Sequence, residues 1–159
     1  MKALVTKIQA ELGPISILVN NAGIGADRAV TEEIDEAMYD RMFDVHVKGT
    51  FFTTRAVLPG MKSYGSGAIV NISSIWGMVG HHFGSTYCAA KAAILGFTKS
   101  WAKELAAFQI TVNTVSPGCE STRRWPDIRS ASSLAMVRPR PEPCVSSAVK
   151  KGSKIRRWA

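Results

Sequence analysis

The 159-residue sequence has few cysteines and no long apolar run. Its three cysteines, Cys88, Cys119 and Cys144, are odd in number and far apart, which argues against a disulfide framework or a paired-cysteine metal site. No apolar run approaches the roughly 18 residues of a membrane span. Residues 1–13 include lysine, glutamine and glutamate where a secretion signal needs a continuous apolar segment. We therefore expect a cytoplasmic protein with no metal site and no membrane partner.

Acidic residues become scarce toward the end of the chain. Residues 1–122 carry ten basic and ten acidic residues, whereas residues 123–159 carry ten basic and two acidic residues. The net charge of +8 therefore arises in the tail. The tail also holds four of the seven prolines, including the extended segment 138–143, and it shows no lasting periodicity. The sequence thus predicts a neutral domain over 1–122 and a disordered basic tail over 123–159.

A basic tail could also bind nucleic acid. Its ten positive charges could release counterions from phosphates. However, the tail has no folded reading element, and only Trp125 and Trp158 could stack on bases. This composition favours non-specific attraction, so we expect no specific nucleic-acid partner.

Short apolar runs typical of strands alternate with longer helical patterns along residues 1–122. We expect Gly13 and Pro14 to stop the first helix, and Thr31 to cap the second, which a break near Met38 could interrupt. The helical patterns cover 1–12, 31 to about 61, and 85–107; the strand patterns cover 15–20, 68–73 and 110–115.

This alternation with short links predicts a parallel sheet. Near-continuous apolar strands are typical of a sheet that is covered on both faces. We therefore predict an α/β fold, part of a Rossmann-type doubly wound parallel sheet with about three strands and two long helices.

The strongest chemical signal is the pair Tyr87 and Lys91 at the start of the last helical pattern. Residues four apart lie on the same face of a helix, so we expect the phenol and the ammonium side by side. A nearby cation favours the phenolate, and such a tyrosine can give or take a proton at a carbonyl or alcohol oxygen. This spacing is common by chance, and alone it also fits a half-buried tyrosine with an unrelated surface lysine.

Polar segments also follow two of the predicted strands, at the edge where open α/β sheets bind ligands. Ser74 follows the strand pattern 68–73 and could hydrogen-bond the oxygen that Tyr87 protonates, although a serine there is more often a turn residue. The run Asn20–Gly23 follows the first strand pattern. Asparagine tolerates left-handed backbone and glycine permits close approach of a ligand, but both also occur in ordinary turns.

Together these segments resemble the short-chain dehydrogenase/reductase family, and within it the 3-oxoacyl-carrier-protein-reductase-like members. The matching motifs occur in the family's order and spacing. The resemblance covers roughly residues 1–122 and implies a Rossmann-type domain. The motifs are LVNNAGIG (18–25), IVNISS (69–74), YCAAK (87–91) and NTVSPG (113–118).

The resemblance implies a role for each matching residue. Tyr87 would be the general acid in reduction and the base in oxidation, and Ser74 would polarise the substrate carbonyl. Lys91 would favour the phenolate and bind the nicotinamide ribose. The remaining cofactor contacts implied are Asn21, Ala22 and Gly23 on the adenosine side, and Pro117, Gly118 and Thr122 beside the nicotinamide.

One position departs from the family pattern inside a matching stretch. In DVHVKGTFF (44–52) the family usually has asparagine where this chain has His46. That asparagine holds a water in a proton relay behind the catalytic lysine, and a histidine can also donate and accept hydrogen bonds. The resemblance therefore makes His46 a catalytic candidate, while a histidine simply packed in a helix explains the residue equally well.

Nothing in the chain matches the glycine-rich turn with which the family holds the cofactor pyrophosphate. We therefore expect an N-terminally truncated family domain with little activity of its own. The implied cofactor is NAD or NADP. The residues present do not distinguish the two, because the discriminating residue lies at the end of the family's second strand.

The resemblance implies an oxidoreductase that moves a hydride between a nicotinamide cofactor and a small-molecule ketone or secondary alcohol. A 3-oxoacyl compound is the substrate that it favours. It also implies a homo-oligomer. The alternative is an inactive module that associates with intact family subunits through the helical patterns 38–61 and 85–107, which supply the family's oligomer interface.

Overall fold

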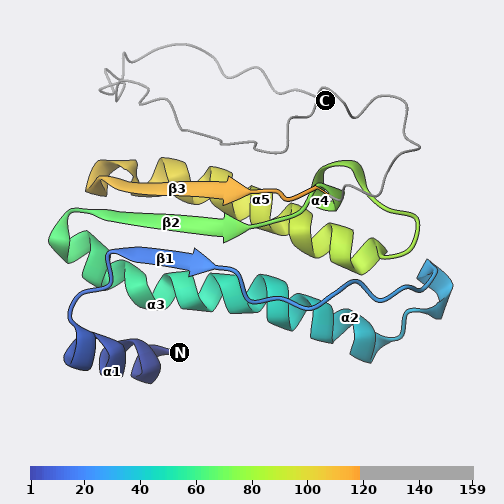
Figure 1. Cartoon of the computed structure of the whole chain (residues 1–159), viewed down its shortest axis with the longest axis horizontal. Helices are drawn as coiled ribbons and strands as arrows, with labels where there is room; N and C mark the ends of the chain where they lie inside the picture. Colours follow the sequence, from blue (N-terminus) through green and yellow to red (C-terminus); the bar gives the residue numbers. More distant parts are fainter. Residues whose placement is uncertain (119–159) are drawn as a thin grey trace, which may run out of the picture.

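The computed structural model describes residues 1–118; Thr122 and the predicted disordered tail lie outside these residues. Helices and strands alternate along the described part of the chain, as the sequence predicts (Figure 1). In chain order the elements are α1 (Lys2–Leu12), β1 (Ile17–Asn20), η1 (Thr31–Glu33), α2 (Glu36–Phe43), η2 (Asp44–Lys48), α3 (Gly49–Tyr64), β2 (Gly67–Ile72), α4 (Trp76–Val79), α5 (Ser85–Leu105), η3 (Ala106–Phe108) and β3 (Ile110–Val115).

The three strands form one parallel sheet in the order β1-β2-β3. Leu18 of β1 pairs with Ile69 of β2, which pairs with Val112 of β3. The parallel sheet that the strand–helix alternation predicts is therefore confirmed. All three carboxyl ends lie at the same edge of the sheet, on the right in Figure 1.

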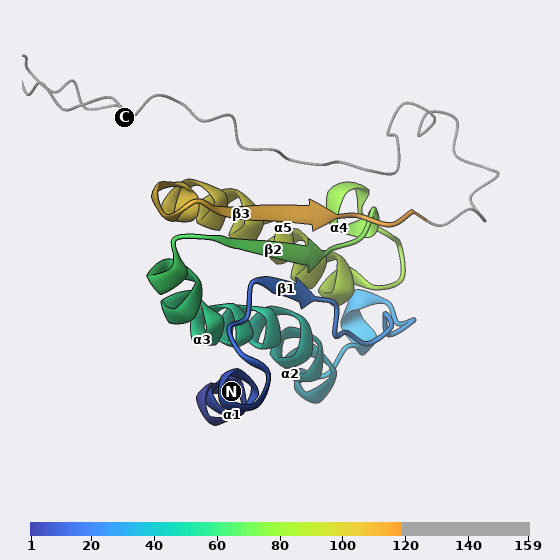
Figure 2. The same ribbon diagram turned by 60° about the vertical axis from the view of Figure 1, so that its left-hand side comes forward.

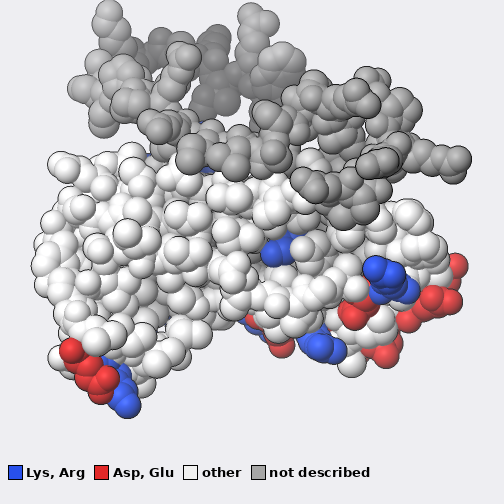
Figure 3. Space-filling view, viewed as in Figure 1, with Lys and Arg blue, Asp and Glu red and all other residues white. Residues whose placement is uncertain are grey.

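Helices α3 and α5 pack on one face of this sheet, and α1 packs beside α3 (Figure 2). Side chains alternate between the two faces of a strand. Ile69 and Val112 are fully buried against the helices, whereas Ile17 and Val19 on β1 are 64% and 54% exposed. The apolar strands predict cover on both faces, and within residues 1–118 the helices supply it for one. The face seen in Figure 3 carries few charged side chains over the strands.

A polar layer crosses the core at the carboxyl edge of the sheet. Asn20 donates to the Thr54 hydroxyl of α3 at 2.9 Å and to the Asn71 side-chain oxygen at 2.8 Å. Asn71 in turn donates to the Thr98 hydroxyl of α5 at 2.9 Å. Because each buried amide finds partners, the layer ties both long helices to the strand ends that carry the candidate site.

The helical pattern predicted to start at Thr31 is divided in the structure. Thr31 begins only the short turn η1, and extended backbone at Ile34 separates this turn from α2. The cap of α2 is Asp35, whose side chain accepts a hydrogen bond from the Met38 amide at 2.7 Å. Threonine and aspartate are both good N-cap residues. The prediction of Thr31 as the cap was wrong because the extended backbone at Ile34 separates Thr31 from the first turn of α2.

The π-helical turn η2 joins α2 to α3. The predicted break near Met38 is thus wrong in place, because α2 is continuous there and the helical pattern is interrupted at Ile34 and between Asp44 and Lys48. The helix then continues to Tyr64 and ends at Gly65, which takes a left-handed φ of 62°. π-helical turns such as η2 occur frequently at functional sites. The turn η2 holds His46, whose side chain is buried, with 2% of the residue exposed.

Candidate active site

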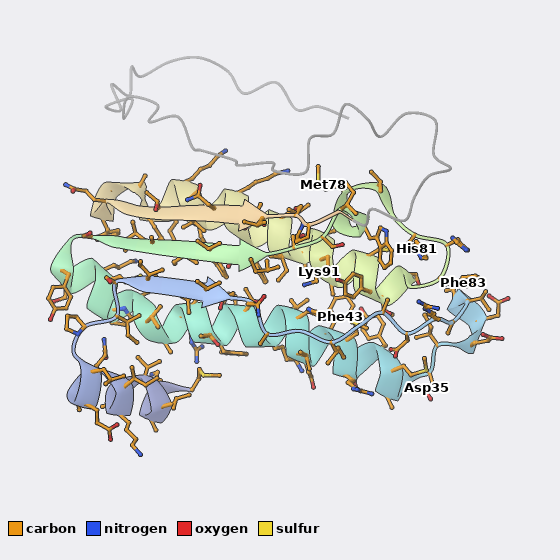
Figure 4. The ribbon with its side chains drawn as sticks, viewed as in Figure 1. Asp35, Phe43, Met78, His81, Phe83 and Lys91 are labelled. Carbon is orange, nitrogen blue, oxygen red and sulfur yellow. The ribbon has the colours of Figure 1, made fainter. Side chains whose placement is uncertain are left out.

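Tyr87 and Lys91 lie one turn apart on α5, at the carboxyl edge of β2. The Lys91 Nζ lies 5.5 Å from the centre of the Tyr87 ring, the proximity that their spacing predicts. Lys91 is 5% exposed, and its ammonium donates to the carbonyl oxygen of Ile72 at 3.0 Å. Burial lowers the pKa of Lys91. Figure 4 shows Lys91 close to the end of β2.

Ser74 follows β2 and is 9% exposed. Its hydroxyl oxygen accepts a hydrogen bond from the Trp76 amide at 3.2 Å, so Ser74 is a turn residue that leads into α4. This bond uses a lone pair and leaves the hydroxyl proton free for an oxygen in the site. The turn and donor interpretations of Ser74 are therefore compatible.

Sequence reasoning missed α4, which lies over the start of α5. The Trp76 ring stacks on His81 at 4.1 Å and meets Tyr87 edge-on at 6.0 Å between ring centres. A Cβ at Gly77 would lie 2.8 Å from the backbone carbonyl carbon of Lys91, so only glycine lets α4 come this close. A four-residue helix has no apolar period, and Gly77 is the one signal that could have indicated close packing.

The loop after β1 carries Asn21, Ala22 and Gly23, which are all exposed. Ile24, next in the chain, meets His46: its amide nitrogen lies 3.2 Å from His46 Nε2 and its carbonyl oxygen 3.0 Å from the same atom. The structure thus brings the predicted adenosine-side loop against a predicted catalytic residue.

His46 also faces Tyr87. Their ring centres are 5.4 Å apart and the ring planes are nearly perpendicular, at 89°. Burial lowers the pKa of His46, and the charge of Lys91 lowers it further, while the hydrogen bond with the Ile24 backbone raises it. His46 is therefore a buried side chain held among three parts of the site.

The segment after β3 reaches the same edge. The Pro117 carbonyl oxygen accepts from the Ile75 amide at 3.0 Å, which joins this segment to the turn after Ser74. Pro117 and Gly118 are exposed. Among the described residues, Ser116 Oγ is buried without a hydrogen-bond partner, an arrangement that favours a ligand or water nearby.

A groove with a volume of about 500 Å³ opens beside the first turn of α5. It is mostly apolar, and the stacked rings of Tyr39 and Phe43, 4.5 Å apart, form part of its wall. Tyr87 and Lys91 do not line it. The lining residues are Thr31, Ile34, Asp35, Glu36, Tyr39, Phe43, Ser85, Thr86 and Ala89.

Residues 1–118 contain neither a cluster of metal-ligating side chains nor a membrane-spanning helix. No group of three or more His, Cys, Asp or Glu side chains in this range could hold a metal ion. None of the described helices has the length and apolar character that crossing a membrane requires.

Residues 1–133 match the family described as short chain dehydrogenase. The chain belongs to this family. It is 45% identical over 117 residues to Nodulation protein G of Azospirillum brasilense, and 43% identical over 140 residues to 3-oxoacyl-(acyl-carrier-protein) reductase of Thermotoga maritima. These alignments cover 74% and 86% of this chain but 47% and 56% of the relatives. The chain thus spans about half the length of the curated relatives it matches.

Solved structures of this family share the fold. A gluconate 5-dehydrogenase from Burkholderia cenocepacia, in complex with NADP and tartrate, matches with a TM-score of 0.71 at 31% identity, covering 77% of this chain and 49% of that chain. A short-chain dehydrogenase from Streptomyces avermitilis matches with a TM-score of 0.71 at 38% identity, covering 77% and 45%. The predicted Rossmann-type architecture is confirmed.

Proposed function

We propose that the chain carries the proton-transfer part of an NAD(P)-dependent oxidoreductase site that acts on a ketone or secondary alcohol. The observation that carries this proposal is that the buried Lys91 lies beside the Tyr87 ring at the carboxyl edge of the sheet, the edge where Ser74 follows β2. Family membership supports it. A cytoplasmic location and a homo-oligomeric state belong to the same proposal.

The residues present suit the nicotinamide end of the cofactor. Lys91 offers a buried ammonium to a ribose, and the Ser116 hydroxyl, which has no hydrogen-bond partner within residues 1–118, lies next to the exposed Pro117 and Gly118. Asn21–Gly23 would line the adenosine side. When bound, the nicotinamide supplies or accepts the hydride. NAD and NADP remain equal candidates.

In reduction, the Tyr87 hydroxyl gives its proton to the substrate oxygen, and in oxidation the Tyr87 phenolate takes a proton back. Lys91, whose Nζ lies 5.5 Å from the centre of the Tyr87 ring, is placed to bind the nicotinamide ribose beside it. Ser74 donates its hydroxyl proton in a hydrogen bond to the same substrate oxygen and so orients the carbonyl. Tyr87 and Ser74 act where charge develops on one oxygen atom.

We favour a 3-oxoacyl compound as the substrate. The support is the 43% identity to a relative whose name states this activity. The relative solved with NADP and tartrate is instead a gluconate 5-dehydrogenase, so the family fold itself does not select the substrate.

Substitution of Tyr87 tests the proposal. In a chimaera that joins the glycine-rich N-terminal segment of a full-length relative to this chain, with a 3-oxoacyl thioester and NAD(P)H, Tyr87→Phe should slow turnover by about 100-fold or more because the proton donor is lost. Its nicotinamide binding, followed by saturation-transfer NMR, should persist. Lys91→Ala should impair both, whereas Lys99→Ala, an exposed lysine on the same helix, should impair neither. Unchanged turnover in Tyr87→Phe contradicts the proposal.

The alternative function is an inactive module that pairs with intact family subunits. Phe51 and Phe52 on α3 are 37% and 40% exposed, and Phe51 lies beside Phe97 and Trp101 of α5. This aromatic surface could contact another subunit. Light scattering of the chain with and without the Thermotoga maritima relative separates the two functions: a mixed complex, together with no turnover by the chain alone, supports the module.

A further inference from the structure

The groove beside the first turn of α5 offers aromatic surface to a small molecule. Its volume of about 500 Å³ is typical of a ligand site. Tyr39 and Phe43 on α2 form part of its wall, and their rings stack with the centres 4.5 Å apart. Tyr39 is 47% exposed, so a ligand can reach its ring. The groove therefore suits a ligand that itself carries a ring.

Acidic side chains dominate the charge around this groove. Residues 31–44 carry six acidic residues against the single basic residue Arg41. Asp35 and Glu36 line the groove, and neither forms an ion pair within residues 1–118. No lysine or arginine of this range lines it. Figure 4 shows Asp35 and Phe43 at opposite ends of α2. The six acidic residues are Glu32, Glu33, Asp35, Glu36, Asp40 and Asp44.

The starts of α2 and α5 also line the groove, and each helix start carries a partial positive charge of about +0.5. Asp35 and Glu36 together carry two full negative charges. The carboxylates therefore outweigh the two helix termini, and the groove attracts a cation rather than an anion. Asp35 accepts from the Met38 amide through Oδ1, which leaves its other carboxylate oxygen for a ligand.

Thr86 adds a second, independent sign of a ligand. It lines the groove and is 5% exposed, and its hydroxyl has no hydrogen-bond partner within residues 1–118. A buried hydroxyl without a partner costs stability, so such a group favours a ligand or water beside it. The neighbouring Ser85 hydroxyl accepts from Thr31 Oγ1 at 3.4 Å and so joins the two sides of the groove.

We propose that the groove binds a small primary amine that carries an aromatic ring. The ring packs against Tyr39 and Phe43, and the ammonium lies at the carboxylates of Asp35 and Glu36. The Thr86 hydroxyl accepts a hydrogen bond from the amine, directly or through a water. The site does not depend on the proposed function, because the proton-transfer residues do not line the groove.

The test is a titration of the full chain with 2-phenylethylamine, followed by NMR shifts of the backbone amides. The shifts should centre on residues 31–43 and 85–89, with a dissociation constant of about 1 mM. Two probes of similar size serve as comparisons. The neutral 2-phenylethanol should bind about fivefold more weakly, and the anionic phenylacetate more weakly still, because only the amine pairs with the carboxylates.

Variants that remove charge but keep shape separate this site from simple apolar adsorption. Glu36→Gln and Asp35→Asn should each weaken amine binding by about threefold, and asparagine still caps α2. Asp40→Asn is the matched control, since Asp40 lies on the same helix but does not line the groove. It should leave binding unchanged. Tyr39→Ala should weaken binding by about fivefold through loss of the ring, and Thr86→Val by about threefold through loss of the hydroxyl.

Amides of β2 and β3 report the folding of every variant, and if a variant does not fold, the three probes with the wild-type chain decide. The proposal is overturned by a lack of saturable shifts, by equal binding of phenylacetate, or by equal weakening in Asp40→Asn. Shifts of the groove amides when the chain is diluted without a probe would make a second copy the occupant and overturn it as well.

Discussion

Among the buried residues of the described part of the chain, His46 and Lys91 are the two with basic side chains. Burial lowers the pKa of both, and the positive charge of Lys91 adds to the effect on His46. Folding therefore disfavours the protonated form of each group. The free energy of unfolding therefore depends on pH through His46 and Lys91, two residues of the candidate site.

The first prediction concerns acid stability. Because the pKa of His46 is lowered from 6.5 in the folded chain, the unfolded chain binds a proton more readily as pH falls below 6.5. The free energy of unfolding should therefore decrease from pH 6.5 downward until the folded pKa is passed. Urea titrations from pH 8 to 5 measure this decrease, and it should be smaller in His46→Gln. Equal slopes in the two proteins contradict the prediction.

The second prediction concerns the contact between α4 and α5. In Gly77→Ala the new Cβ would meet the α5 backbone at 2.8 Å, which cannot move aside as a side chain can. The free energy of unfolding should fall by about 1–3 kcal/mol. Gly96→Ala is the matched control, since nothing lies within 4 Å of its Cβ. It should raise stability by about 0.5–1 kcal/mol, because alanine suits a helix interior better.

At the scale of elements, a local cap determines where α2 begins, and a contact between distant residues determines where α3 lies on the sheet. Asp35 starts α2, while the polar layer from Thr54 to Asn20 fixes α3 against the sheet. The cap depends on neighbouring residues only, whereas the polar layer needs partners from β1 and β2. The start of the helix is therefore locally encoded, and its place on the sheet is not.

The third prediction compares two candidate caps. Asp35→Ala should lower the free energy of unfolding by about 1 kcal/mol because the Met38 amide loses its acceptor. Thr31→Ala should have little effect, since its side chain caps no amide of η1. Chemical denaturation of both variants measures the difference. A larger loss in Thr31→Ala than in Asp35→Ala would reverse the assignment.

The sequence predicts the strands and the motif residues of the site, but not the start of α2 or the turn η2. All three strands follow from apolar runs, and the motifs bring Tyr87, Lys91 and Ser74 to one edge. The cap at Asp35 depends on backbone at Ile34 that no pattern indicates. The turn η2 and the contact between Ile24 and His46 depend on tertiary packing between segments 22 residues apart, so periodicity could not predict them.

At the scale of the whole molecule, the described residues form a sheet with helices on one face and a partly exposed opposite face that carries few charged side chains (Figure 3). Within residues 1–118, β1 is the edge strand that pairs with β2 alone, and its Ile17 and Val19 are exposed. Such an edge readily pairs with another chain. Association and solubility are therefore properties to measure before any kinetic work.

The fourth prediction is weak binding of the whole dinucleotide by this chain. The sequence has no match to the glycine-rich turn that holds the pyrophosphate, so several hydrogen bonds to phosphate are lost. The affinity should fall by on the order of a thousandfold or more relative to a complete site. Calorimetric titration with NADH and NADPH measures it, and micromolar binding of either would refute the prediction.

The turn η2 has a consequence for the rotational phase of the helix around it. Met42, His46, Thr50 and Thr54 are all buried, at intervals of four residues. A regular α-helix advances about 100° per residue, so three such steps would carry Thr54 about 120° away from the face of Met42. The wider π-turn absorbs this drift. Deleting one residue between 44 and 48 would leave eleven residue steps from Met42 to Thr54, a drift of only about 20° in a regular α-helix, so both buried faces would stay on one side while His46 would lose its place in the wider turn.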